Sequence, residues 1–590
     1  MSDSIFGIDL GTANSVIAVV QDGAPRVLAV ADGLLLPSVL GLDPAGNLLV
    51  GERARNQRAA YPESSLSSVK RHMGSDRALR LGDRELTPPE ASALILKELA
   101  RGAEASTGEP VRRVVITVPA FFQDAQRAAT RLAGEIAGLE VVRLINEPTA
   151  AALAFDHGER GRERRLLVYD LGGGTFDVSI VTSDDELTEV LASHGDVQLG
   201  GDDIDRLLAD RLIESLGLAA DDAELDAVAQ ARILEAAERA KRLLTEEVSV
   251  HVREEFLRSG AQPLHLDTVI EREEFEALIE PLIERTLDSV HEALTRAGRT
   301  LSEIDDVLLV GGQTRTPRIA QRLKSLTGVA PRRDVHPDLC VALGAAIAGA
   351  QSAGIATARV LVDVTPYTFG TSALDDAWDF GRSERFVSII ERGTPLPVVR
   401  SQTFYTAADG QTEIDVKVFQ GESDDPRHNL LVGRFLVDDL SPRPEHSPVH
   451  FKFMLGLDGI LDVEVVDPST KKSQRTRIED ATARLDPSQL AAARERTLAL
   501  WGGREGEPGE GAAAAQAEPA GRAAEPAWAT ALRESSSRAL DLLERMAAED
   551  RADARALIDD AEDAILRGDA ALAETLKAEL DDLVHYVEEA

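Results

Sequence analysis

IDLGTANSVIAVV (8–20) and YDLGGGTFDVSIVT (169–182) are the two stretches that decide the fold. In each, an apolar segment ends in Asp-Leu-Gly, small or hydroxyl residues follow, and a second apolar segment begins. Short runs rich in branched apolar residues are typical of strands, and the glycines between them indicate a tight turn. One such unit is common in proteins. Two in one chain indicate duplicated half-domains that face each other across a cleft.

Both turns have the chemistry of a phosphate site. Glycine lets the backbone approach a ligand closely, and successive turn N–H groups bind anions. Thr12 and Thr175 add hydroxyl donors, and Asp9 and Asp170 stand at strand ends where they could hold Mg²⁺ through water. The chain has no Gly-Lys dipeptide and therefore no Walker A loop. A strand-like segment follows GGGTF, which argues against a dinucleotide-binding turn.

Outward from these stretches, residues 1–357 alternate strand-like runs with helical ones, which predicts an α/β architecture. A helix is predicted over 124–137, with Asp124 as its N-cap and Gly138 beyond its end. Two more glycine pairs, in DVQLGGDDID (196–205) and VLLVGGQTRTP (307–317), precede predicted helices.

The pattern changes at Val360. Residues 365–480 contain strand-like runs and turn signals, which predict an all-β domain. Residues 485–501 are predicted to be helical, and 502–527 carry small, acidic, Pro and Gly residues that predict a disordered linker. Residues 528–590 return to an amphipathic helical pattern, with a break expected at 567–569.

Composition excludes several classes of protein. The chain has 590 residues, and 64 basic against 102 acidic residues give a formal net charge of −38. This balance argues against a nucleic-acid or anionic-membrane binder, which needs clustered Lys and Arg. A single cysteine, Cys340, excludes internal disulfides and is interpreted as a small buried apolar residue. No apolar run has the length of a membrane helix and the N-terminus does not read as a signal peptide, so we expect a cytoplasmic protein.

The motifs taken together resemble the DnaK-type chaperones, the 70-kDa heat-shock protein family, over nearly the whole chain. The resemblance is carried by IDLGTANS, VKR (69–71), VPAFFQDAQR (118–127), INEPTAAALAF (145–155), YDLGGGTFDVS, GDVQLGGDD (195–203), AAERAK (236–241), VGGQTRTP (310–317), VLVDVTP (360–366) and FQGE (419–422). It implies a multidomain chain: an α/β actin-like (ribonuclease H-like) two-lobed ATPase domain, a β-sandwich peptide-binding domain and an α-helical lid. The implied boundaries are 1–358 for the nucleotide-binding domain, 359–365 for the linker, 366–482 for the β-sandwich, 483–501 for the start of the lid, 502–527 for the disordered linker and 528–590 for the C-terminal helical segment.

The resemblance also implies roles for individual residues. Those that match magnesium and catalytic positions are Asp9 and Asp170 for the metal, and Lys70, Glu147, Asp177 and Thr175 for catalysis. Those that match nucleotide-binding positions are Gly11, Thr12, Ala13, Gly172, Gly173, Gly174, Gly200, Gly201, Glu238, Lys241, Gly311, Gly312, Arg315 and Asp338. From the sequence alone, Lys70 reads as a solvated surface lysine and Glu147 as a helix-start acid, so their catalytic roles come from the resemblance.

Two further groups are implied in the same way. Positions that dock a J-domain co-chaperone or relay signals to the linker match Pro119, Arg127, Arg143, Asn146, Thr149 and Asp363. Positions of the peptide groove match Leu374, Phe404, Ala407, Ile414 and Val416, although alternation at Ile414 and Val416 fits a sandwich core equally well.

We therefore expect an ATP-dependent chaperone, a Mg²⁺-dependent ATPase (with K⁺ as a further ion) whose hydrolysis of ATP to ADP and phosphate controls the binding of extended apolar segments of unfolded proteins. The implied partners are a J-domain co-chaperone and a nucleotide-exchange factor, and the protein is expected to be monomeric. Three alternatives stay open: an enzyme on the same fold such as a sugar kinase, a holdase that binds ATP without turnover, and a filament-forming actin relative.

The chain departs from the family pattern at several places. Ala13 stands where a second hydroxyl residue is usual, and Leu339-Cys340 replaces Glu-Ala. The stretch between Arg71 and Thr87 is much shorter than in typical members, which trims one lobe and puts exchange-factor docking there in question. The linker at 502–527 interrupts the helical lid.

Overall fold

The structure is a computed structural model. It describes residues 4–30, 33–156, 163–184, 187–219, 225–258, 263–332, 336–355, 360–375, 383–438, 440, 442, 444–470, 473–478 and 487–502, with short stretches between 528 and 561 and residues 570–589. Of the predicted disordered linker, 502–527, Gly502 is helical, and residues 503–527, like the predicted helix break at 567–569, lie outside the described residues.

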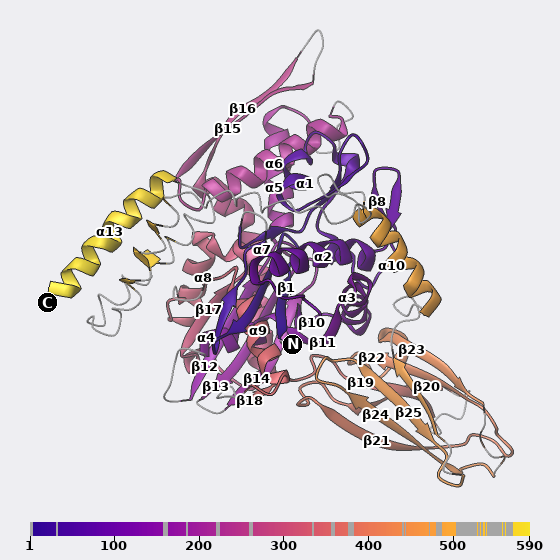
Figure 1. The fold of residues 1–590 in the computed structure, drawn as a ribbon. Helices are drawn as coiled ribbons and strands as arrows, with labels where there is room; N and C mark the ends of the chain where they lie inside the picture. Colours follow the sequence, from indigo (N-terminus) through magenta and orange to yellow (C-terminus); the bar gives the residue numbers. More distant parts are fainter. Residues whose placement is uncertain are drawn as a thin grey trace.

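Two sheets of the N-terminal region share one pairing pattern (Figure 1). In the first sheet, of order β11-β10-β1-β2-β3, β1 pairs antiparallel with β2 and parallel with β10. In the second, of order β17-β12-β13-β14-β18, β12 pairs antiparallel with β13 and parallel with β17. The strands of the first sheet are β1 (Ile5–Leu10), β2 (Asn14–Gln21), β3 (Ala24–Val27), β10 (Arg113–Val118) and β11 (Glu140–Asn146), with β4 (Leu36–Pro37) beside β2. Those of the second are β12 (Arg164–Leu171), β13 (Phe176–Ser183), β14 (Leu187–Asp196), β17 (Asp306–Val310) and β18 (Val360–Val362). The shared pattern confirms the predicted duplication.

Helices and small sheets surround these two sheets. The helices are α1 (Glu52–Gln57), α2 (Pro88–Thr107), α3 (Asp124–Ala137), α4 (Glu147–Asp156), α5 (Gly201–Ser215), α6 (Ala227–Leu243), α7 (Arg272–Ala297), α8 (Pro317–Thr327) and α9 (Cys340–Ser352). The small strands are β5 (Leu40–Leu42), β6 (Leu48–Val50), β7 (Ser65–Leu66), β8 (Leu79–Leu81), β9 (Arg84–Leu86), β15 (Ser249–Arg258) and β16 (Leu264–Glu271). The hairpin β15–β16 projects from the body of the molecule (Figure 1).

Helix α9 packs against both β1 and α4, and glycines make the approach possible. A Cβ at Gly7 of β1 would lie 2.1 Å from the Ala346 nitrogen, and one at Gly344 of α9 would lie 1.8 Å from the Ala150 carbonyl oxygen. Cys340, at the start of α9, is buried as expected. Close packing of this kind holds the first sheet and the start of α4 in a fixed relation, and both carry candidate site residues.

The β-rich region, residues 369–478, forms two antiparallel sheets, of order β20-β19-β22-β23 and β21-β24-β25-β26. Side chains of both sheets, among them Val418, Phe453 and Val463, share one apolar core, as in a sandwich. The strands are β19 (Phe369–Asp375), β20 (Ser383–Ile390), β21 (Val398–Tyr405), β22 (Ile414–Gln420), β23 (Leu430–Val437), β24 (Pro448–Leu455), β25 (Leu461–Val466) and β26 (Ser473–Ile478). The described part of 365–480 contains one 3₁₀ turn (Pro426–His428) besides these strands, so the all-β prediction is confirmed there.

Strand β18, the β-rich region and the helix after it all contact the N-terminal region. Strand β18 pairs in parallel with β14. Arg131 of α3 forms an ion pair with Asp458, with 2.6 Å between Nη2 and Oδ2. Helix α10 (Pro487–Gly502) packs on α2 and α3, where Arg496 pairs with Glu90 at 2.6 Å. Helix α13 (Ala570–Glu589) ends the described chain.

One local prediction was wrong. Gln123, not Asp124, is the N-cap of α3: its backbone is extended, and its N–H donates to Gln126 Oε1 at 3.0 Å. Asp124 is instead the first helical residue, where a carboxylate still interacts favourably with the helix dipole. Among the described residues, no helix combines the length and the apolar character that a membrane span requires.

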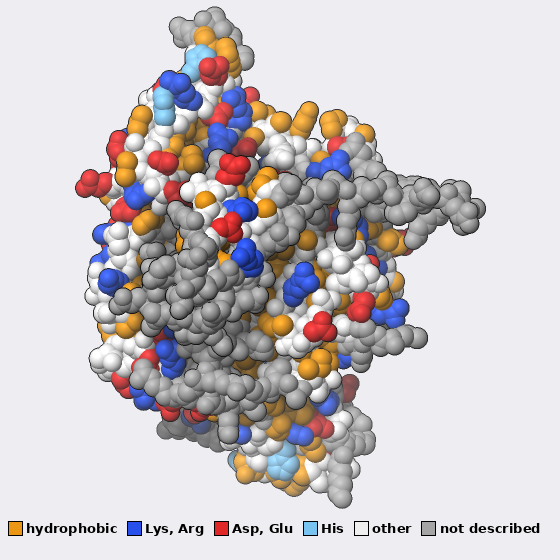
Figure 2. Space-filling model, turned by 60° about the vertical axis from the view of Figure 1, so that its left-hand side comes forward, with side chains coloured by type: hydrophobic (Ala, Val, Ile, Leu, Met, Phe, Trp, Pro, Cys, Tyr) orange, Lys and Arg blue, Asp and Glu red, His pale blue; other side chains and the backbone are white. Residues whose placement is uncertain are grey.

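On the face shown in Figure 2, acidic and basic side chains are interspersed among the described residues. The excess of acid is therefore spread over this face rather than gathered in one area.

Candidate functional site

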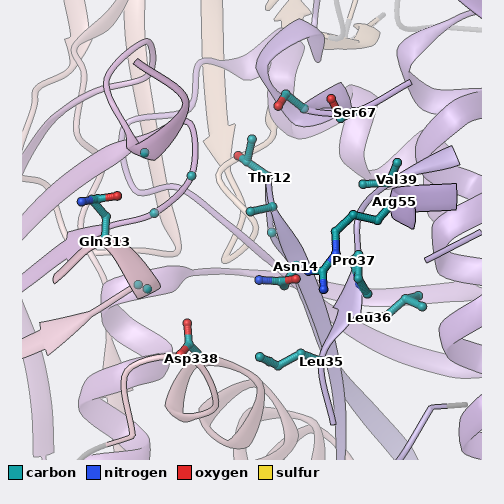
Figure 3. A pocket seen from close by; sticks show the side chains of 18 of the residues that line it. Thr12, Asn14, Leu35, Leu36, Pro37, Val39, Arg55, Ser67, Gln313 and Asp338 are labelled. Atoms are coloured by element: carbon teal, nitrogen blue, oxygen red, sulfur yellow. The ribbon is translucent and has the colours of Figure 1, made fainter. Parts of the chain in front are cut away.

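A cleft of about 1270 Å³ lies between the two sheets of the N-terminal region. This exceeds the roughly 300–1,000 Å³ of most small-molecule sites. Figure 3 shows Thr12, Asn14 and Arg55 on one wall and Gln313 on the opposite one. Most predicted metal, catalytic and nucleotide residues line it: Asp9, Gly11, Thr12, Ala13, Lys70, Glu147, Asp170, Gly172, Gly173, Thr175, Gly201, Glu238, Lys241, Gly311, Gly312, Arg315 and Asp338.

Gly174, Gly200 and Asp177 are the three predicted residues that do not line the cleft. Gly200 packs behind the second turn, because a Cβ there would lie 2.5 Å from the Gly174 nitrogen. The start of α5 holds the same turn, since the N–H of Gly201 donates to the Gly172 carbonyl at 2.9 Å. These glycines shape the turn, and the neighbouring residues face the cavity.

Asp9 and Asp170 lie at the ends of strands β1 and β12 and line the cleft, where Asp170 is buried and Asp9 is half-buried. Burial, and then the nearby Glu147, raises the pKa of Asp9 to about 7 and raises that of Asp170 well above its usual range. Thr117 Oγ1 donates to Asp9 Oδ1 at 2.9 Å. Acidic side chains that lie close together in a buried site favour a bound cation. Among the described residues, however, no group of three or more His, Cys, Asp or Glu is placed to hold a metal directly.

Lys70 lies on the 3₁₀ helix η2 (Val69–His72) and forms a buried ion pair with Glu147, the first residue of α4. Its exposed fraction is 5 %, so the surface-lysine interpretation is wrong. Burial alone would lower the pKa of Lys70, but Glu147 and Asp9 together raise it. The ammonium group therefore stays charged in the cleft.

The helix η2 is fixed from across the cleft. Ser68, which precedes it, has a left-handed backbone (φ 54°), and its hydroxyl donates to Asp202 of α5 at 2.6 Å. Arg71 pairs with Asp203 of the same helix at 3.1 Å. Lys70 is thus held by both walls of the cleft.

Asp177 on β13 lies beneath the cleft and is 1 % exposed. Its Oδ1 accepts the N–H of Phe121 at 3.0 Å. Burial, and then Glu147, raises the pKa of Asp177 well above its usual range. Strand β14 leaves room for this carboxylate at Gly195, where a Cβ would lie 2.8 Å from Oδ1.

Ion pairs line the mouth of the cleft. Glu238 pairs with Arg58 at 2.9 Å, a contact between the two walls. Lys241 pairs with Asp205 at 2.8 Å, and Arg315 with Asp338 at 2.8 Å. Gly311, with a φ of 81°, makes the turn after β17 that brings this end together.

Several lining residues were not predicted from the sequence. They are Asn14, Leu35, Leu36, Pro37, Arg55, Arg58, Ser67, Asp202, Asp205 and Gln313. Asn14, Asp202, Asp205 and Gln313 stood inside quoted motifs, so proximity to a motif could have found them. Arg55 and Arg58 belong to no motif and carry no comparable signal.

A second polar cluster surrounds Asp363, just after β18. Asp363 Oδ2 accepts from Asn146 Nδ2 at 2.8 Å and from Thr149 Oγ1 at 3.2 Å. Arg127 Nη2 donates to Asn146 Oδ1 at 2.7 Å. Burial lowers the pKa of Arg143, and the nearby Asp363 opposes that shift.

This cluster lies next to the cleft in the chain. Pro119, in the turn after β10, accepts the N–H of Phe122 at 3.1 Å, and Arg127 Nε donates to the Phe122 carbonyl at 3.1 Å. Because Glu147 follows Asn146 directly, the cluster lies one residue away from the cleft.

The five predicted groove residues are distributed differently. Val416 is 1 % exposed and belongs to the sandwich core, which Ile414 packs against. Phe404 is half-buried, with its ring centroid 4.7 Å from that of Phe451. Ala407 is half-buried too, and Leu374 is 42 % exposed. The structure brings the core residues together and leaves Leu374 at the surface.

Comparison with known proteins gives one family over nearly the whole length. A family model described as Hsp70 protein matches residues 5–80 and 77–590. The matched segments include both turns of the cleft, the Asp363 cluster and the β-rich region. The chain belongs to the Hsp70 family.

Proposed function

We propose that this protein is an ATP-dependent chaperone in which an actin-like, two-lobed ATPase domain controls peptide binding by the β-rich region. The observation that carries the proposal is the arrangement of Asp9, Lys70, Glu147 and Asp170 around one cleft between two similarly built sheets. The domain boundaries proposed are those given by the resemblance, with the linker at 359–365.

The cleft suits a nucleoside triphosphate. The turns that end in Ala13 and Thr175 offer backbone N–H groups to phosphate oxygens, and the charged Lys70, paired with Glu147, lines the same cleft. Phosphoryl transfer to water needs positioning and charge neutralisation more than covalent chemistry. In this proposal Lys70 neutralises phosphate charge, Glu147 orients the attacking water and accepts its proton, Asp177 helps to orient that water from beneath the cleft, and Thr175 donates to a phosphate oxygen. Arg315, Asp338, Glu238 and Lys241 hold the nucleoside.

Asp9 and Asp170 fit a magnesium ion held through water. Asp170 is buried and Asp9 partly buried at the strand ends, and burial, with Glu147 nearby, raises the pKa of both carboxyls, so a bound cation would favour their charged forms. When bound, the ion would neutralise phosphate charge. K⁺ is proposed as a second, weaker cation.

The Asp363 cluster is the proposed coupling element. The Asp363 carboxylate is bound by residues at the start of α4, and Glu147 lies in the same turn. A change in how the linker docks would therefore act on a cleft residue through a short, buried path. The half-buried Arg143, beside this buried cluster, is proposed to help dock a J-domain co-chaperone, and an exchange factor would complete the cycle.

The direct test measures ATP turnover by the full-length protein with and without an extended apolar peptide. We expect slow basal hydrolysis that the peptide accelerates. Asp363→Ala should still hydrolyse ATP but lose the acceleration, because coupling is a difference in interaction between two states. The matched control is Asp415→Ala, which removes an exposed carboxylate of β22 that is paired with Arg434 of β23. This variant should keep the acceleration by peptide.

Other outcomes point to the alternatives. Phosphate transfer to a sugar, with no effect of peptide, would indicate a kinase on the same fold. Peptide binding and ATP binding without hydrolysis in a single-turnover experiment would indicate a holdase, which the buried Lys70–Glu147 pair argues against.

A further inference from the structure

Phe121 is held from two sides, by the candidate hydrolysis site and by the β-rich region. Its N–H donates to Asp177 Oδ1 at 3.0 Å, and its carbonyl accepts the Tyr367 hydroxyl at 2.7 Å. Neither Phe121 nor Tyr367 has a role in the function proposed above. One residue therefore connects a buried carboxylate to a side chain that follows the linker.

The ring of Phe121 is confined as well as its backbone. Its centroid lies 5.1 Å from that of His194 on β14 and 4.9 Å from that of Tyr367, both in tilted arrangements that aromatic rings favour. Gly195, beside His194, packs against Asp177, so the ring stack and this carboxylate involve neighbouring residues of β14. Tyr367 thus contacts Phe121 through its ring as well as through its hydroxyl.

Tyr367 is attached to the β-rich region rather than to the N-terminal region. The N–H of Thr365 donates to the Thr394 carbonyl at 3.1 Å, and the N–H of Thr368 donates to the Glu422 carboxylate at 3.0 Å. If the β-rich region separates from the N-terminal region, Tyr367 moves away with the β-rich region. The hydroxyl can bind Phe121 only in the docked arrangement seen here.

The contact bears on Asp177 through the Phe121 N–H. This hydrogen bond lowers the pKa of Asp177, against the larger effect of burial, and it occupies one carboxylate oxygen. Burial, with Asp177 nearby, raises the pKa of Tyr367, so its hydroxyl stays protonated and acts as the donor. A carboxylate whose oxygen is engaged in this way has less freedom to orient water.

We propose that Tyr367 is a positioning residue that restrains Asp177 through the backbone of Phe121 while the β-rich region is docked. The inference rests on the proposed function, in which Asp177 acts beside the attacking water. Undocking of the β-rich region moves the Tyr367 hydroxyl away from Phe121, relaxes the 119–123 turn and frees the Asp177 carboxylate. Peptide binding and hydrolysis would then both depend on this one contact.

The first test is Tyr367→Phe in the full-length protein, which keeps the ring and removes the hydroxyl. Basal kcat should rise about fivefold, the value of one hydrogen bond, with KM for ATP unchanged. Peptide acceleration should shrink by the same factor. Tyr405→Phe removes a hydroxyl from a 61 % exposed tyrosine on β21 and should change neither quantity. An unchanged kcat in Tyr367→Phe would overturn the inference.

A double-mutant cycle asks whether the effect acts through docking. In an Asp363→Ala background, where the linker contacts are already weakened, Tyr367→Phe should add little, because the two changes remove one shared arrangement. Fully additive effects of the two substitutions on kcat would contradict the inference that Tyr367 acts through docking.

Hydrogen exchange separates this inference from the proposed function. The Phe121 amide should exchange faster in Tyr367→Phe than in the wild-type protein or Tyr405→Phe, whether or not ATP is hydrolysed. Unchanged exchange would overturn the Tyr367 contact at any level of turnover. Faster exchange in a protein without ATP turnover would overturn the proposed function alone.

Discussion

The burial of Lys70 indicates a functional role rather than that of a solvated surface lysine. A buried ammonium group is costly unless it is paired, and Lys70 is paired with the equally buried Glu147. Both side chains line the cleft instead of filling a core, so the Lys70 ammonium and the Glu147 carboxylate are available to a ligand. This arrangement is typical of a functional site.

Lys70→Ala should therefore impair hydrolysis far more than binding. Turnover should fall by on the order of 10²–10³, the usual effect of losing one partner of transition-state charge. ATP affinity, measured by titration calorimetry, should change little because the backbone N–H groups of both turns also hold the phosphates. Lys324→Ala, on the exposed face of α8, is the control. Unchanged turnover in Lys70→Ala would exclude Lys70 from the mechanism.

At the scale of single residues, the sequence predicted which residues lie together better than it predicted the contacts that each of them makes. That Asp9, Thr12 and Asp170 lie together could be predicted because strand-turn-strand patterns put residues at strand ends, and all three line the cleft. The environment of Lys70 could not be predicted, since its partner is 77 positions away in the chain. Arg58 and Glu238, 180 positions apart, meet for the same non-local reason.

Among the elements, those with a clear period or a clear boundary were predicted well. The strand over 5–10 and the helix over 124–137 match β1 and α3 to the residue. The helix α9 was not singled out, because it carries no charged residue and is buried on all sides, so it has no amphipathic pattern. Strand β14 was missed in the same way, as its residues alternate only in part.

Helix α10 offers a prediction at the scale of elements. Its Ala493 and Leu500 belong to the apolar core around α2 and α3, and Arg496 pairs with Glu90, which is 2 % exposed. Arg496 itself is largely exposed, so the pair is screened and should contribute at most about 1 kcal/mol. Arg496→Ala should speed amide exchange in α10 about two- to fivefold while the rest of the chain is unaffected.

The neighbouring Glu495→Ala tests whether that result is specific. Glu495 is exposed on the same helix, and its removal alters helix charge by one unit without touching Glu90. Equal effects of the two variants would mean that the Arg496–Glu90 pair does not hold α10 in place.

At the scale of the whole molecule, the contacts between regions could not be predicted from local patterns. The motifs indicated a duplicated α/β region and a β-rich region, yet nothing in them brings Arg131 to Asp458 or Tyr367 to Phe121. Such pairs depend on how complete domains dock, which involves few residues at great sequence separation. The same docking explains why α10, predicted as the start of a lid, lies on α2 and α3.

The position of α10 leads to a prediction about peptide release. In this arrangement α10 is packed against the N-terminal region, and the composition of residues 503–527 predicts a flexible connection to the helices beyond it. Helices joined in this way confine a bound peptide weakly, since ordering the connection opposes closure. Deleting residues 503–590 should therefore change the peptide dissociation rate in the ADP state by less than about tenfold, or ~1.4 kcal/mol. Stopped-flow release of a labelled peptide from the full-length and truncated proteins measures this directly. A release rate a hundredfold faster after truncation would show that the C-terminal helices act as a tight lid.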